Sequence, residues 1–355
     1  LNDLLAALNH PELETEKVYQ PRIRAEDLLR EGTGQDTGDF REVAGQENAK
    51  RGAEIAAAGF HNLLMIGPPG VGKSMVAGRI PGILPPLTLK ESLEVTGIFS
   101  VAGLLPPGQA LITRRPFYAP HHTVTQAALI GGGSGIPRPG MVSLAHRGVL
   151  FLDELPEFRK NVLDGMRQPM EERKVQIARS AGMVTYPSDF ILVAAMNPCP
   201  CGYYPDRNKC RCTQPQIEKY LGKISGPILD RIDLCVELHP VDILHLQKTK
   251  TEKSSEDMKR QIRHARERQA ERFAGTDCRF NGDIRSAQVE EYCPLGEEGQ
   301  KVMEQLYRTL QLSARVYHRI LKTARTIADL EDREEITGEH LLEAACYRPS
   351  ETYWN

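Results

Sequence analysis

The chain has 355 residues, of which 40% are hydrophobic and 26% are charged. This length and balance are typical of a globular protein of about two domains, and no apolar run reaches the ~18 residues that a membrane-spanning helix needs. The formal net charge of −2 excludes a surface that attracts nucleic acid as a whole, so contact with nucleic acid must come from a local patch or from a pore formed by several copies.

The N-terminal segment, residues 1–40, is predicted to be a linker or the remnant of a preceding domain. Residues 1–11 lack the basic start, long apolar centre and small-residue cleavage site of a signal peptide. Residues 32–38 (GTGQDTG) are typical of a linker. The chain begins at Leu1 and not at a methionine, so we expect an N-terminal domain to be missing. Without a secretory signal, we expect a cytoplasmic protein with reduced cysteines.

Short apolar runs alternate with helical segments up to about residue 245. This alternation predicts an α/β fold with a mostly parallel sheet and helices on both faces. A stretch rich in Gly, Pro and His, residues 84–147, has only weak periodicity, and residues 174–187 alternate about a turn, which predicts a β-hairpin. The expected elements are helix 46–58 ending at Gly59, strand 61–66, helix 74–80, strand 148–152, helix 159–171, strand 190–196 and strand 236–238.

Strand signals stop after residue 245. The charged segment 253–274 has apolar residues at helical spacing, and further helical patterns follow it. We therefore expect an α/β domain, 41–245, then a helical connector, 246–295, and a second, all-α domain, 296–355. The apolar positions of 253–274 are Met258, Ile262, Ala265 and Phe273, and the later helices are predicted at 297–312, 314–331 and 338–347.

A glycine-rich motif, GPPGVGKS, lies between the first predicted strand and a predicted helix. It fits the pattern G-x-x-x-x-G-K-[ST], in which backbone N–H groups and the positive end of the helix surround phosphate groups. Lys73 is expected to reach the β- and γ-phosphates of ATP, and the Ser74 hydroxyl to bind Mg²⁺. The alternative is a tight turn with a chance Lys-Ser pair. The motif consists of Gly67, Pro68, Pro69, Gly70, Val71, Gly72, Lys73 and Ser74.

Polar side chains follow two of the other predicted strands. Asp153 and Glu154 come after GVLFL, and a carboxylate at the carboxyl end of a buried strand lies beside the P-loop in this architecture. Asp153 is expected to hold Mg²⁺ and Glu154 to activate the attacking water; the alternative is a surface pair that caps the next helix. Asn197 follows FILVAAM and could position the water or contact the γ-phosphate, although Asn-Pro alone is usually a turn.

Two arginines are candidates for the positive charge that stabilises a transferring phosphoryl group. Arg231 lies in GPILDRID, and Arg315 lies in SAR at the start of a helix in the all-α region. Surface ion pairs are the alternative for both, because arginines are common.

Four of the eight cysteines form a cluster with the spacing C-x-C-x₈-C-x-C. Four sulfurs suit tetrahedral Zn²⁺, and four protein ligands leave no open position for catalysis. The C-x-C spacing is tighter than the usual C-x₂₋₄-C, so free thiols and disulfides remain alternatives. The four residues are Cys199, Cys201, Cys210 and Cys212.

Five motifs in this order, GPPGVGKS, GVLFLDE, AAMNPCPCG, GPILDRID and SARVYHRILKTARTIADL, resemble AAA+ P-loop ATPases of the magnesium-chelatase-like type, close to the ComM/YifB group. The resemblance covers about residues 41–348. ITRRPFYAPHHT (112–123) and residues 131–158 are especially specific. This group usually carries an N-terminal domain similar to the Lon protease domain, which residues 1–40 do not contain.

The resemblance implies a role for each matched residue. Lys73 and Ser74 would be Walker A, and Asp153 and Glu154 Walker B. It also implies hexameric rings and a lid formed by residues 296–355. It further implies an insert at about 95–130 and a pore role for the hairpin at about 174–188. The cysteine loop, 199–212, follows this hairpin. Asn197 would be sensor 1, Arg315 sensor 2, and Arg231 an arginine finger for the ATP of a neighbouring subunit.

Basic residues on or beside the hairpin would form a ring of positive charge in a hexamer, which could grip the DNA backbone. They are Arg173, Lys174 and Arg179; the alternative is a solvated hairpin. Residues 114–122 interleave basic and aromatic groups and could contact DNA or a neighbouring subunit.

The function that the resemblance implies is an ATP-driven ring motor acting on DNA, with helicase or branch-migration activity as in natural transformation or recombination. The alternative is a chelatase-type ATPase chaperone that remodels a partner protein. A passive nucleotide switch is disfavoured because Glu154 completes a hydrolysis set. We expect no membrane partner.

Overall fold

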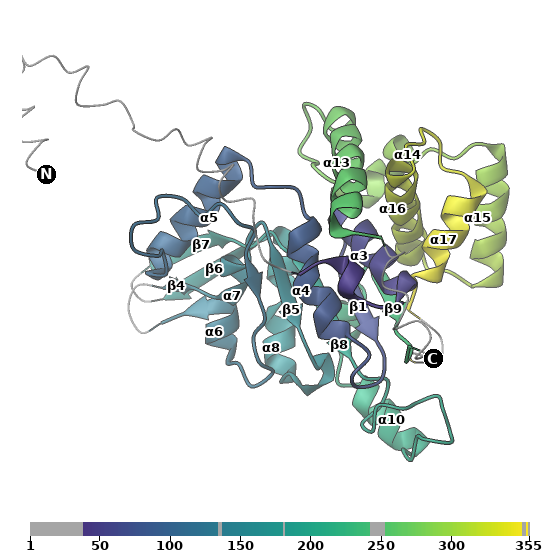
Figure 1. Cartoon of the computed structure of the whole chain (residues 1–355), viewed down its shortest axis with the longest axis horizontal. Coiled ribbons are helices and arrows are strands. Elements are labelled where there is room, and N and C mark those ends of the chain that lie inside the picture. Colours follow the sequence, from purple (N-terminus) through teal and green to yellow (C-terminus); the bar gives the residue numbers. More distant parts are fainter. Residues whose placement is uncertain (1–37, 134–136, 180–181, 242–252, 350–352, 354–355) are drawn as a thin grey trace, which may run out of the picture.

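The computed structural model describes residues 38–133, 137–179, 182–241, 253–349 and 353. Of the expected N-terminal linker, only residues 38–40 are described, and the expected boundary at residues 245–246 also lies outside the described residues. A parallel five-stranded sheet occupies the centre of the α/β part (Figure 1). Its strands lie in the order β2(Phe117–Tyr118), β5(Val149–Leu152), β8(Ile191–Met196), β1(Leu63–Ile66) and β9(Leu234–Glu237).

The central strand β1 is hydrogen-bonded to β8 on one side and to β9 on the other, both in parallel. Leu63 and Met65 belong to the core on one face of the sheet, whereas Leu64 and Ile66 belong to the core on the other face. Side chains of a strand alternate between the two faces, so burial on both faces requires continuous apolar runs. The predicted α/β class is confirmed, and all four predicted strands are present.

Helices α3(Glu47–Gly59) and α4(Lys73–Ile83) pack against the sheet. The small side chains Ala53, Ala56 and Ala57 of α3 are completely buried, which lets α13 and α16 approach closely. Helix α3 ends as predicted at Gly59, and the following Phe60 has the left-handed backbone of a helix C-terminus (φ 59°).

The region of weak periodicity contains a 14-residue helix, α5(Leu89–Ala102). It begins with a capping box, in which the Thr88 hydroxyl accepts from Glu91 N and the Glu91 carboxylate accepts from Thr88 N. The sequence signal for this helix was therefore the Thr-x-x-Glu pattern, since its apolar residues do not form a clear stripe. The remaining elements of this region are short: α6(Gln126–Ile130), β3(Gly131–Gly132), β4(Arg138–Pro139) and α7(Met141–Leu144).

The prediction of one helix over 159–171 was wrong. After η3(Leu155–Glu157), the structure has two helices, α8(Lys160–Gly165) and α9(Arg167–Glu172), which meet at Met166. Pro169 has no N–H to donate to the carbonyl four residues earlier, so a continuous helix would lose this bond. The predicted hairpin follows α9 as β6(Lys174–Arg179) and β7(Gly182–Pro187).

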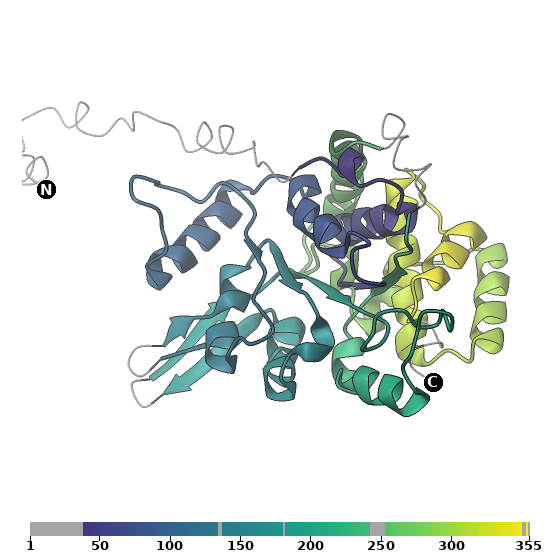
Figure 2. The ribbon, with the colours of Figure 1, turned by 60° about the horizontal axis from the view of Figure 1, so that its bottom comes forward.

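The C-terminal part is helical, as predicted. Met258, Ile262 and Ala265 on α13(Ser255–Arg272) are buried, and α13 packs against α3 and α16. Figure 2 shows α5 and the hairpin β6–β7 extending to the side away from these C-terminal helices. The other elements that follow β8 are α10(Gln214–Leu221), α11(Gly226–Leu229), η5(Asn281–Asp283), η6(Ser286–Gln288), α14(Val289–Tyr292), α15(Glu297–Thr309), α16(Ala314–Leu330) and α17(Gly338–Cys346).

A buried carboxylate joins several of the C-terminal elements. Asp329 on α16 is fully buried and accepts from Arg272 at 2.6 Å, from Arg325 at 3.1 Å and from Asn281 Nδ2 at 2.8 Å. These partners come from α13, from α16 itself and from η5. The carboxylate therefore neutralises guanidinium groups that the packing of the helices has removed from water.

We predict that Asp329→Ala lowers the free energy of unfolding by about 3–5 kcal/mol, because it leaves buried guanidinium charge without a partner. Asp332→Asn is the matched control: Asp332 is exposed and pairs with Arg268, so its loss should cost less than about 1 kcal/mol. Urea unfolding measures both. Equal effects of the two substitutions would contradict this account of Asp329.

Candidate nucleotide site

The P-loop connects the carboxyl end of β1 to the first turn of α4. Gly67 N donates to Met196 O on β8 at 3.2 Å, which ties the start of the loop to the neighbouring strand. Gly70 and Gly72 have φ values of +80° and +95°, a backbone that favours glycine. The loop therefore leads into the N-terminus of α4, where free N–H groups favour an anion.

Lys73 lies at the centre of the site. Its Nζ donates to Gly67 O at 2.6 Å, to Pro68 O at 2.9 Å and to Asn197 Oδ1 at 3.0 Å. Burial lowers the pKa of this ammonium, while the negative charges of Asp153 and Glu154 act in the opposite direction. The structure thus brings together the predicted phosphate-binding lysine and the predicted polar residue at the end of β8.

The two candidate Mg²⁺ ligands are in contact. Ser74 Oγ donates to Asp153 Oδ2 at 2.9 Å, and Asp153 Oδ1 accepts from Glu154 N at 2.9 Å. A hydroxyl and a carboxylate beside a phosphate-binding loop are the oxygen ligands that Mg²⁺ takes. These residues therefore fit magnesium bound together with a nucleoside triphosphate.

Glu154 has a partner that sequence analysis did not identify. His122 Nδ1 lies 3.1 Å from Glu154 Oε2, and the backbone of Glu154 is left-handed (φ 52°). His122 follows β2, the edge strand that pairs with β5, so its place near Glu154 depends on strand order. The sequence signal was only the proximity of a histidine pair to a short strand.

Arg231 lies near the amino ends of the strands, whereas the P-loop lies at their carboxyl ends. Asn62, which precedes β1, donates through Nδ2 to Arg231 O at 2.8 Å, and its own N donates to Asp233 Oδ2 at 2.9 Å. The P-loop begins at the other end of β1, and four strand residues span about 13 Å. The sheet therefore separates the backbone of Arg231 from the P-loop of the same chain.

Arg315 lies with Arg231 and not with Lys73. Its guanidinium is paired with Asp230, the residue before Arg231, while Arg231 is paired with Glu171. Partial burial lowers the pKa of Arg231, and the positive charges of Arg315 and Arg167 lower it further. The structure thus divides the predicted catalytic residues into a P-loop group and an arginine group.

Two of the basic residues predicted on or beside the hairpin, Arg173 and Lys174, differ in their surroundings. Arg173 is paired with Asp283 and lies 3.5 Å from Asp189, so its charge is already neutralised at the base of the hairpin. Asp189 also binds Arg147 at 2.7 Å and pairs with Arg279. Lys174 is exposed at the start of β6, and Arg179 is the last residue of that strand.

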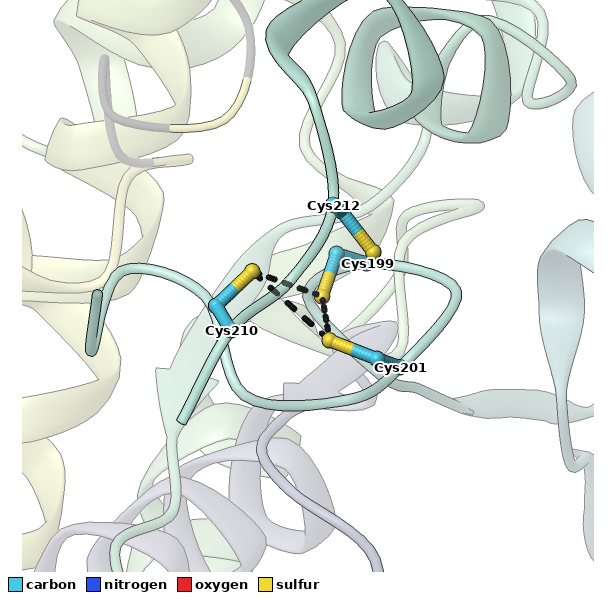
Figure 3. A group of neighbouring side chains, drawn as sticks. All are labelled: Cys199, Cys201, Cys210 and Cys212. Atoms are coloured by element: carbon cyan, nitrogen blue, oxygen red, sulfur yellow. Dashed lines mark hydrogen bonds between the residues drawn. The ribbon is translucent and has the colours of Figure 1, made fainter. Parts of the chain in front are cut away.

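The four cysteines converge between β8 and α10 (Figure 3). Their sulfur atoms lie within 4.8 Å of one another. Cys199 Sγ is 3.4 Å from Cys201 Sγ and 3.8 Å from Cys210 Sγ, and the sulfurs of Cys201 and Cys210 are 3.6 Å apart. Four thiolates about 2.3 Å from a tetrahedral Zn²⁺ are roughly 3.8 Å from one another. The cluster therefore has the dimensions of a zinc site, whereas a disulfide requires sulfurs about 2.05 Å apart.

Two family models match the chain in succession. One, described as magnesium chelatase, subunit ChlI, matches residues 39–246, and the other, the ChlI C-terminal model, matches residues 252–348. The chain belongs to the magnesium chelatase ChlI family. Its fold is the AAA+ type of core expected for that family, with a helical C-terminal region. Among the described residues, no helix is both long and apolar enough to cross a bilayer.

Relatives of this ChlI-family chain include YifB, a protein of uncharacterised function from Salmonella typhimurium, which is 46% identical over 88% of this chain and 60% of its own length. The competence protein ComM from Haemophilus influenzae is 43% identical over 89% of this chain and 61% of its length. The magnesium-chelatase 67 kDa subunit of Chlorobaculum parvum is 25% identical over 62% of this chain and 34% of its length. The chain thus spans about 60% of the length of YifB and ComM, and it belongs with this group of the family.

We predict that Glu154→Gln keeps nucleotide binding but lowers ATP turnover by about 10²–10⁴-fold, the usual contribution of a general base. Glu157→Gln is the control, because Glu157 lies three residues away and pairs with Lys223 at the surface. Steady-state phosphate release and binding of a fluorescent ATP analogue measure the two properties. Unchanged turnover in the Glu154 variant would remove this residue from the mechanism.

Proposed function

We propose that this chain is an ATP-hydrolysing motor that acts on DNA as a ring, six copies in the arrangement that the family resemblance implies. One observation carries the proposal: the P-loop group lies at the carboxyl ends of the strands of the sheet, and the arginine group lies at their amino ends. A complete hydrolysis site therefore needs the P-loop group of one chain and the arginine group of another. A ring provides this contact for every copy.

In this proposal each side chain has a defined task. Lys73 binds the β- and γ-phosphates, Asn197 orients the attacking water, and Glu154 accepts its proton after leaving His122. Ser74 and Asp153 would hold Mg²⁺, which would neutralise the negative charge that develops on the phosphate oxygens. Arg231, together with Arg315, supplies positive charge to the nucleotide of the neighbouring chain.

DNA is the proposed substrate of the motor. Support comes from the competence protein ComM among the relatives and from the projecting hairpin, where Lys174 and Arg179 repeat in every copy of a ring. Such a girdle of charge suits a phosphate backbone. The specific activity proposed is helicase or branch-migration activity of the kind used in natural transformation or recombination, in the cytoplasm.

The magnesium-chelatase 67 kDa subunit among the relatives supports a second candidate. In that case the ring would be an ATPase chaperone that remodels a partner protein, and DNA would not affect its turnover. The proposed cofactors are the same in both cases: ATP with Mg²⁺ at the P-loop, and a structural zinc ion at the four cysteines.

DNA stimulation of ATP turnover distinguishes the two candidates. We predict that single- or double-stranded DNA raises turnover, and that Lys174→Ala weakens DNA binding and reduces its dependence on salt, because one phosphate contact is lost per copy. Lys301→Ala is the control, since Lys301 is exposed on α15 in the C-terminal region. Turnover that is unaffected by DNA at low salt would favour the chaperone.

Assembly is tested by mixing two inactive variants. We predict that Arg231→Ala alone binds ATP but is nearly inactive, because an arginine finger contributes about 10³–10⁵-fold in rate. Mixing it with Lys73→Ala should restore some turnover, since the Lys73→Ala chain presents Arg231 to the intact P-loop of its neighbour. ATPase activity across mixing ratios, with sedimentation to follow assembly, measures this. Mixed rings without rescue would exclude Arg231 as the finger, and a fully active monomer would exclude the ring.

A further inference from the structure

The cysteine loop contacts both sides of the nucleotide site. On one side, Cys199 lies two residues after Asn197, whose Oδ1 accepts from Lys73. On the other side, Gly202 packs against the P-loop: a Cβ at Gly202 would lie 2.6 Å from Pro69 Cδ and 3.0 Å from its Cγ. The same loop therefore touches the phosphate-binding segment and the end of β8 that carries the sensor residue.

The cysteine cluster joins the two ends of this loop, and Arg207 adds contacts with Cys212 O at 3.4 Å and with the ring of Tyr204. No helix or strand lies between Met196, the end of β8, and Gln214, the start of α10, a length at which irregular loops are uncommon in compact domains. Within residues 198–213 the buried residues are Pro198, Cys199, Gly202 and Cys210, and most of the others are exposed. The thiols join the first part of the loop to its last part (Figure 3), and Cys199 and Cys210 also belong to the core on one face of the sheet.

The donor set is selective for one class of ion. Four cysteine sulfurs favour a soft or borderline divalent cation in tetrahedral geometry, and they fill every coordination position. Such an ion does no chemistry on a substrate, but its binding energy stabilises the folded loop. The position of Gly202, one residue after Cys201, then depends on that ion.

We propose that the four cysteines bind one Zn²⁺ and that this ion fixes Asn197 and Pro69 relative to each other, so that ATP turnover requires bound zinc. The inference rests on the proposed function in one respect, namely that the P-loop hydrolyses ATP. Loss of the ion frees the loop between the two contacts, and the bond between Lys73 and Asn197 loses its support. Displacement of a positioning group by about 1 Å can cost about 10²-fold in rate, whereas the backbone amides of the P-loop still bind phosphate.

The first test is metal content. The full chain, purified under reducing conditions, should contain about one Zn²⁺ per chain by elemental analysis, released by a mercurial thiol reagent. Refolding with Co²⁺ alone should give the intense absorption of tetrahedral cobalt thiolate. Purified protein that hydrolyses ATP without a metal ion at the four cysteines would overturn the proposal.

The second test separates turnover from binding. Cys210→Ser should lose zinc and lower kcat by about 10–100-fold, with affinity for a fluorescent ATP analogue within about threefold of the original chain. Cys346→Ser is the matched control, because this thiol is exposed on α17, outside the cluster, and the substitution should change neither zinc content nor kcat. A zinc-free Cys210→Ser protein with full kcat contradicts the coupling.

Reversible removal of zinc covers the case in which Cys210→Ser fails to fold. The unaltered chain, depleted with a chelator under reducing conditions, should lose turnover, and added Zn²⁺ should restore it. Equal turnover with and without zinc overturns the inference and leaves the ATPase proposal intact. No turnover in the zinc-loaded chain, with or without DNA, counts against the ATPase proposal itself.

Discussion

The parallel pairing of β1 with β8 is the constraint on which the rest of the site depends. Ile66 pairs with Met196, so the two strands end at the same level, and the residues that follow them, Gly67 and Asn197, emerge side by side. Backbone hydrogen bonding of the apolar strands thus brings the backbones of Gly67 and Asn197 together, and the loops that follow orient the side chains of the site. Asn62 precedes β1, so Asn62 and its partner Arg231 lie at the other, amino ends of the strands.

Much of this arrangement could be predicted from the sequence, because its signals are local. The strands are buried on both faces and appear as apolar runs, and the P-loop is recognisable from its glycines and its place between strand and helix. Helix α5 was missed because its marker, the Thr88–Glu91 capping box, is short and its apolar pattern is weak. The break at Met166 follows from Pro169, a local signal that the expected single helix over 159–171 ignored.

Other features could not be predicted, because they depend on which strands become neighbours. The contact between His122 and Glu154 requires β2 to lie next to β5, although 30 residues separate Tyr118 from Val149. The pairing of Arg315 with Asp230 requires α16 to lie near the amino ends of the strands. The packing of Gly202 on Pro69 requires the cysteine loop to fold back onto the P-loop. Spacing along the chain carries no information about such contacts. It was sufficient to predict that the four cysteines come together, because they are close in sequence.

The charged group around Asp189 has a mechanical consequence. Asp189 and Arg173 lie where the hairpin leaves the α/β part, and their partners Arg279 and Asp283 belong to the C-terminal region. These ion pairs therefore connect the base of the hairpin to the segment that follows α13. A strand of six residues is about 20 Å long, so a rotation of roughly 10° at the base of the hairpin would move the backbone of Arg179, the last residue of β6, by about 3.5 Å.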